Sequence, residues 1–68
     1  MDNITEGMIL NYVGPDGTPT KCKVLVVPPN ATMAEVRWLE ARWDLAANSL
    51  VARKGTKSIV SAFRLTPL

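Results

Sequence analysis

Apolar and polar residues alternate along Thr20–Val27, which is the clearest periodic pattern in the chain. One face of the segment would hold Cys22, Val24 and Val26, and the other would hold Lys21, Lys23 and Leu25. A period of two residues is typical of a half-buried β-strand, so we expect a strand with Cys22 on its core face. Pro28-Pro29-Asn30 ends it, because proline cannot donate a hydrogen bond to a neighbouring strand.

The apolar segment Met8–Val13 precedes this strand and is its expected partner. The connection between them, Gly14–Pro19, contains Asp16-Gly17, and such a pair supplies the positive φ that a tight hairpin turn needs. The pattern therefore predicts an antiparallel β-hairpin over residues 8–27.

Residues 31–48 fit two interpretations. A helix over about 33–47 would begin with a capping box of Thr32 and Glu35. Its apolar face would hold Val36, Leu39, Trp43 and Ala47. A strand would instead place Ala34, Val36 and Trp38 on one face. We favour the strand over Met33–Trp38, because the flanking hairpins need a third partner to be stable, and an α+β fold with the helix is the alternative.

The C-terminal third predicts more strands. Ser49–Arg53 and Thr56–Val60 flank Lys54-Gly55 and predict a second hairpin. Arg64–Pro67 predicts a short last strand, where a terminal proline is tolerated at a sheet edge. No linker or internal repeat interrupts the pattern, so we expect one domain over residues 1–68.

The order of these elements resembles that of SH3-like small β-barrels, including the Tudor and KOW types. The likeness is carried by Gly7–Tyr12 followed by Asp16-Gly17 and Lys21–Val24, by Ala34–Trp38, and by Ile59–Leu65. The resemblance implies a mainly β fold, a five-stranded barrel with a 3-10 turn near residues 61–63. The chain departs from the pattern over Leu39–Asn48, which is longer than the tight turn usual at that point.

The composition restricts the chemistry open to so small a domain. The 68 residues are 47% hydrophobic and include one cysteine and no histidine, with a net charge of +2. A single cysteine excludes a disulfide within the chain, and we expect no metal and no cofactor. The N-terminal Met1–Glu6 lacks the features of a signal peptide, and no apolar run is long enough to span a membrane. We therefore expect no membrane association and a cytoplasmic protein.

Catalysis is not expected. Cys22 lies between two lysines, but its place in the alternation predicts a buried, inert thiol. The carboxylates Glu35, Glu40 and Asp44 would approach one another only if the segment were helical, and solvated surface charge is the simpler interpretation. Gly14 and Gly17 belong to the hairpin turn, so they do not form a phosphate-binding loop.

A protein-binding role is the first hypothesis. Leu39–Ala47 is more apolar than a solvent-exposed connection should be, so it either folds over the barrel or forms an interface, with a partner or a second copy. Tryptophan and arginine together favour an interface hot spot. The candidate partner-binding residues are Arg37, Arg42, Trp43 and Leu45. A domain of this size fits a bacterial or phage accessory protein that docks on a larger assembly, by analogy alone.

Nucleic-acid binding through basic hairpins is the alternative hypothesis. The candidate residues are Lys21, Lys23, Arg53, Lys54, Lys57 and Arg64. If they share one side of the barrel they could contact phosphates, whereas the plainer interpretation is ordinary solvated surface charge. Both tryptophans could equally be core residues, because a small domain needs their buried area.

Overall fold

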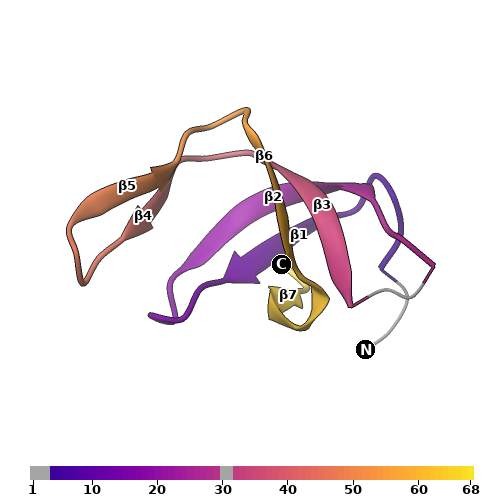
Figure 1. Ribbon diagram of the computed structural model, residues 1–68, viewed down its shortest axis with the longest axis horizontal. Coiled ribbons are helices and arrows are strands. Elements are labelled where there is room, and N and C mark those ends of the chain that lie inside the picture. Colours follow the sequence, from indigo (N-terminus) through magenta and orange to yellow (C-terminus); the bar gives the residue numbers. More distant parts are fainter. Residues whose placement is uncertain (1–3, 30–31) are drawn as a thin grey trace.

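The computed structural model describes residues 4–29 and 32–68, which form seven strands and one 3-10 turn (Figure 1). The elements are β1 (Ile9–Val13), β2 (Pro19–Val26), β3 (Met33–Trp38), β4 (Arg42–Asp44), β5 (Ser49–Ala52), β6 (Lys57–Ser61), η1 (Ala62–Arg64) and β7 (Leu65–Thr66). Five strands make an antiparallel sheet in the order β6-β3-β2-β1-β7, and β4 and β5 make a separate two-stranded sheet. The prediction of a mainly β fold is confirmed.

The first hairpin is confirmed. Strands β1 and β2 pair from Ile9 opposite Lys23 to Val13 opposite Pro19. Their turn contains Gly17 with φ +83°, a backbone conformation that side chains with a Cβ rarely adopt. The Asp16 carboxylate accepts a hydrogen bond of 3.0 Å from the Thr18 N–H, which closes the turn locally. Asn30, which was expected to help end β2, lies outside the described residues.

The predicted core face of β2 is correct for Cys22 and Val24 and wrong for Val26. Cys22 and Val24 are buried, but Val26 is 46% exposed. The pairing of β2 with β3 shifts register between Val24 and Val26, as at a β-bulge. An extra residue in one strand reverses the face to which the following side chains point, so Val26 leaves the core.

Residues 33–47 are not helical, so the helix alternative and its capping box are wrong. Strand β3 pairs with β2 on one side and β6 on the other, as the strand interpretation predicted. Its alternate residues Ala34, Val36 and Trp38 are buried between these neighbours. Sheet pairing on both edges and burial of one whole face outweigh the local helix propensity of this segment.

The second predicted hairpin is wrong in its pairing. A turn does occur at Lys54-Gly55, with Gly55 at φ +90°. The strands that flank it separate, however, because β5 pairs with β4 and β6 pairs with β3. The backbone of Trp38 closes the end of the β3–β6 ladder. Its backbone N–H donates to the Thr56 carbonyl at 2.9 Å, and its carbonyl accepts from the Gly55 N–H at 2.7 Å.

The sheet is open, so the expectation of a closed five-stranded barrel is corrected. The 3-10 turn occurs at Ala62–Arg64, one residue beyond its predicted place, and the Ser61 hydroxyl accepts from the Phe63 N–H. This turn carries the chain from edge strand β6 to edge strand β7. Strand β7 has two residues and pairs with β1 alone, which is too short a ladder to close the sheet on itself.

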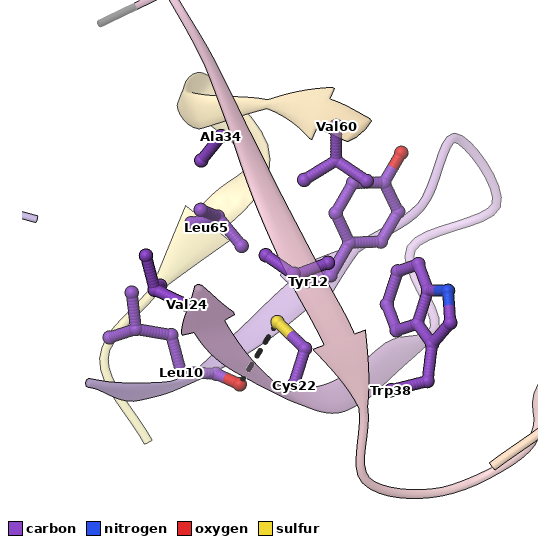
Figure 2. Packing of buried hydrophobic residues seen from close by; sticks show 9 residues of the cluster. Leu10, Tyr12, Cys22, Val24, Ala34, Trp38, Val60 and Leu65 are labelled. Atoms are coloured by element: carbon purple, nitrogen blue, oxygen red, sulfur yellow. Dashed lines mark hydrogen bonds between the residues drawn. The ribbon is translucent and has the colours of Figure 1, made fainter. Parts of the chain in front are cut away.

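The core lies on one face of the five-stranded sheet (Figure 2). Its buried apolar residues are Leu10, Tyr12, Cys22, Val24, Ala34, Val36, Trp38, Val60 and Leu65. Trp38 is fully buried, and its indole N–H donates to the Ser58 hydroxyl at 2.9 Å, so the polar edge of the ring is satisfied. The Tyr12 and Trp38 rings meet edge to face with centroids 5.4 Å apart.

Candidate interaction surfaces

Strands β4 and β5 with the turn between them, residues 42–52, form an arm that extends from one end of the five-stranded sheet (Figure 1). The described molecule measures 35 × 21 × 19 Å along its principal axes, which is elongated for a chain of this size. The four-residue turn of the arm, 45–48, includes Asn48 with φ 52°, a left-handed conformation that asparagine tolerates better than most residues.

Arg42 fastens the base of the arm to the core. Its guanidinium carbon lies 4.7 Å from the centroid of the Tyr12 ring and 5.6 Å from that of Trp38. A cation this close to two aromatic faces is attracted by their quadrupoles. The half-buried Arg42 therefore holds β4 against the Tyr12–Trp38 pair.

Asp16 links the β1–β2 turn to the tip of the arm. One carboxylate oxygen accepts from Thr18 N–H, and the other accepts from the Leu45 N–H at 3.4 Å. The hydrogen bond from Thr18 is the largest cause of the lowered pKa of Asp16, with the bond from Leu45 acting in the same direction. The arm is thus tied to the sheet at its base by Arg42 and near its tip by Asp16.

The arm exposes four large apolar side chains to solvent. They are Trp43 (49% exposed), Leu45 (66%), Leu50 (39%) and Val51 (49%). Trp43 and Leu50 are direct cross-strand partners, so they form one continuous apolar pair on the ribbon. This set, Trp43, Leu45, Leu50 and Val51, is called the arm surface below.

A hollow of about 470 Å³ lies where the arm faces the β1–β2 turn. Its lining residues include Pro15, Asp16, Arg42, Trp43 and Val51. The hollow gives the arm surface a concave border with three charged groups, Asp16, Arg42 and Asp44, beside apolar side chains. A concave border with both charged and apolar groups can receive a protruding side chain of a partner protein, which a flat apolar patch cannot do as well.

The structure separates the four residues predicted to bind a partner. Trp43 and Leu45 belong to the arm surface, Arg42 is occupied by the aromatic rings, and Arg37 lies on the outer face of the five-stranded sheet. Leu50 and Val51 were missed, because their segment was assigned to a hairpin with β6. The signal for them was the pair of adjacent apolar residues, which no single strand face can bury together.

A smaller apolar groove of about 220 Å³ lies over β2, β3 and β6. Its lining includes Val26, Met33 and Ile59, and Ile59 is 69% exposed. Glu35 also lines it, so a carboxylate borders the apolar floor. The groove lacks an aromatic side chain, whereas the arm surface has Trp43.

The register of the sheet brings basic residues into one row. Arg37 on β3 is directly opposite Lys23 on β2 and directly opposite Lys57 on β6. All three side chains are exposed, and the neighbours of Arg37 in sequence, Val36 and Trp38, are buried on the opposite face. Lys23, Arg37 and Lys57 are called the basic row below. Arg37 was not among the predicted nucleic-acid contacts, because its cross-strand partners are set by register rather than by local sequence.

The other predicted nucleic-acid contacts are distributed around this row. Lys21 lies two residues before Lys23 on the same side of β2. Lys54 belongs to the turn whose Gly55 carbonyl accepts from the Arg37 guanidinium at 2.7 Å. Arg53 begins that turn. Arg64 lies apart, on η1, with its guanidinium donating to the Val13 carbonyl at 3.4 Å.

Cys22 is buried in the core, as predicted. Its side chain is 0% exposed, and its thiol donates to the Leu10 carbonyl at 3.6 Å (Figure 2). Burial raises the pKa of this thiol to about 11, so the neutral form predominates at neutral pH. A thiol in this state is a poor nucleophile.

The described part of the chain contains no group of three or more histidine, cysteine, aspartate or glutamate residues arranged to hold a metal ion. Over residues 4–29 and 32–68, none of the helical segments is long and apolar enough to cross a membrane.

Comparison with protein-family models, with curated proteins and with solved structures gives no match for this chain. The arm surface and the basic row are therefore the features from which function is inferred.

Proposed function

We propose that this protein is a binding module without catalytic activity and that the arm surface is where it docks on another protein. The observation that carries the proposal is the exposure of four large apolar side chains on a ribbon that stands away from the core. Several large apolar side chains exposed on one short ribbon and bordered by polar groups are typical of an interaction site.

The energetics of the arm support docking. A two-stranded ribbon is at best marginally stable alone in water. The arm is such a ribbon, because β4 and β5 pair with each other and neither pairs with a strand of the five-stranded sheet. Covering the exposed half of Trp43 would remove about 100 Å² of apolar surface from water and contribute roughly 2–3 kcal/mol. Binding would therefore stabilise both the arm and the complex.

A second copy of the chain is the partner that the sequence of β5 favours. Strand β5, Ser49–Ala52, contains no charged residue and no proline, which are the usual devices that prevent edge-to-edge pairing. If β5 pairs antiparallel with β5 of another copy about the Leu50–Val51 bond, only neutral residues face one another. Strand β6, in contrast, carries Lys57 at the edge of the other sheet.

Sedimentation velocity over a range of concentrations tests this proposal. We expect the wild type to form dimers, and Trp43→Ser and Leu45→Ser to shift it toward monomer. Phe63→Ser is the matched control, because Phe63 is 81% exposed but lies on η1. Thermal unfolding of each variant shows whether the fold is kept.

A wild type that is monomeric at every concentration would contradict the second copy as partner. Docking on a different protein would then be tested by photo-crosslinking from position 45, with position 63 as control. Equal crosslinking from both positions would overturn the arm surface as the docking site.

We further propose that the sheet is an open member of the SH3-like class. The strand order β6-β3-β2-β1-β7 and the 3-10 turn between β6 and β7 support this likeness. The single, buried cysteine is consistent with a reducing, cytoplasmic location. Cross-strand contacts measured by NMR that gave a different strand order would contradict the class assignment.

A further inference from the structure

The basic row is electrostatically unfavourable for the folded protein by itself. Like charges directly opposite each other on neighbouring strands destabilise a sheet, and Lys23, Arg37 and Lys57 make two such pairs in succession. Neighbouring strands are about 4.8 Å apart, so the row places three cations along a line of about 10 Å. Three cations held side by side in this way indicate a binding site for a ligand whose negative charge offsets their mutual repulsion.

The acidic groups near the row leave it positively charged. Glu35 lies two residues before Arg37 on β3, directly opposite Val26 on β2 and Ile59 on β6. Its side chain is half-buried. Glu40 accepts from the backbone N–H of Lys21 at 2.9 Å. Lys21 and the basic row thus bring four cations to this part of the sheet, and neither Glu35 nor Glu40 is directly opposite a member of the row.

We propose that the basic row binds the phosphate backbone of double-stranded DNA without reading its sequence. Lysine and arginine contacts to phosphates fix a protein on a duplex but carry no base information. The Arg37 guanidinium has five N–H donors and gives one bond to the Gly55 carbonyl, so donors remain for a phosphate oxygen. The row provides up to three phosphate contacts.

A duplex fits the row better than other polyanions do. A single strand is usually held by aromatic side chains on which its bases stack, and the outward-facing residues of β2, β3 and β6 include none. The row crosses three neighbouring strands of a sheet that packs on the core, so its cations are held on a firm support, which suits a rigid polymer with regularly repeated phosphates. An acidic peptide or an anionic vesicle offers no such regular line.

This surface is separate from the arm surface, so the DNA proposal does not depend on the protein-docking proposal. Fluorescence anisotropy with a short labelled DNA duplex, at several salt concentrations, measures both affinity and the salt slope. For three phosphate contacts the slope of log K against log salt is about −2.7, so affinity falls about 40-fold between 50 and 200 mM salt. Single-stranded RNA, polyglutamate and anionic vesicles serve as competing ligands.

Two variants of equal charge change isolate the row. Lys57→Gln removes a row contact, so its slope should fall by about 0.9, whereas Arg64→Gln should keep the wild-type slope. Lys23→Gln with Lys57→Gln should bring the slope to about −0.9, with a thermal midpoint equal to or above that of wild type because opposed cations are removed.

Three results would overturn the proposal. The first is no binding of wild type to the duplex at low salt. The second is the same slope for Lys57→Gln and Arg64→Gln, which would indicate non-specific attraction by net charge. The third is tighter binding to single-stranded RNA, polyglutamate or vesicles than to the duplex, which would assign the row to that ligand instead.

Discussion

Replacing Arg42 with glutamine tests whether the arm is held by its contact with the core. Glutamine keeps part of the aliphatic stem of arginine but loses the charge that lies 4.7 Å from the Tyr12 ring and 5.6 Å from the Trp38 ring. Both rings belong to the buried core, so the substitution acts on the core and the arm together. We expect lower global stability and a more weakly attached arm.

The size of the effect follows from the position of the guanidinium. A cation over an aromatic face contributes about 0.5–1 kcal/mol when exposed and about 2 kcal/mol when desolvated. Arg42 is half-buried and shared between two rings, so we expect a loss of about 1–2 kcal/mol. In a domain of this size, that loss lowers the thermal midpoint by roughly 4–16 °C.

Urea unfolding followed by tryptophan fluorescence measures the global effect, and amide hydrogen exchange measures the arm. Arg42→Gln should speed exchange in β4 and β5 more than in β2 and β3. Arg42→Lys keeps the charge but not the planar guanidinium, so an intermediate loss is expected. Arg53→Gln is the matched control, because it changes the net charge equally at an exposed position.

Equal urea midpoints for Arg42→Gln and Arg53→Gln would refute the argument. The same conclusion would follow if Arg42→Gln lowered the midpoint without changing exchange in the arm, because the contact would then serve the core alone.

Two further predictions concern pH. Burial raises the pKa of Cys22 to about 11, so the free energy of unfolding should fall by roughly 2–3 kcal/mol as the pH rises from about 9 to about 11, where only the unfolded thiol ionises. Cys22→Ala should lack this loss in urea unfolding across the same pH range. The lowered pKa of Asp16 means that its ionised form stabilises the fold above the ordinary carboxyl pKa, and that this stabilisation disappears as the pH falls through the lowered value. Asp16→Asn should show less acid destabilisation than wild type and faster exchange of the Leu45 amide at neutral pH; identical acid profiles would contradict the role of Asp16.

Local sequence patterns predicted the strands better than they predicted which strands pair. The alternation around Cys22 and Val24 located β2 and its core face, because a period of two needs no knowledge of neighbours. Lys54-Gly55 correctly predicted a turn, but turn chemistry does not decide which strand lies beside each flank. Val26 was misplaced for a related reason: a β-bulge is defined by two strands, and one strand alone does not show it.

The tryptophans and Arg37 show the same limit for the candidate surfaces. Trp38 and Trp43 are five residues apart in similar sequence surroundings, yet one is 0% and the other 49% exposed. Trp38 is buried because it shares a face with Val36 in a strand paired on both sides, whereas Trp43 belongs to the arm. Arg37 belongs to the basic row only because the pairing register places it beside Lys23 and Lys57, which are distant in sequence.

The path of the chain through the arm has a consequence for how this protein can change over evolutionary time. Strands β3 and β6 are neighbours in the five-stranded sheet, and the arm is inserted in the single connection between them. Changes in the length or sequence of residues 43–51 can therefore keep the order of all five strands, as long as Arg42 retains its contact with the Tyr12 and Trp38 rings. The arm is an exchangeable insertion whose binding specificity can diverge while the sheet that displays it is retained.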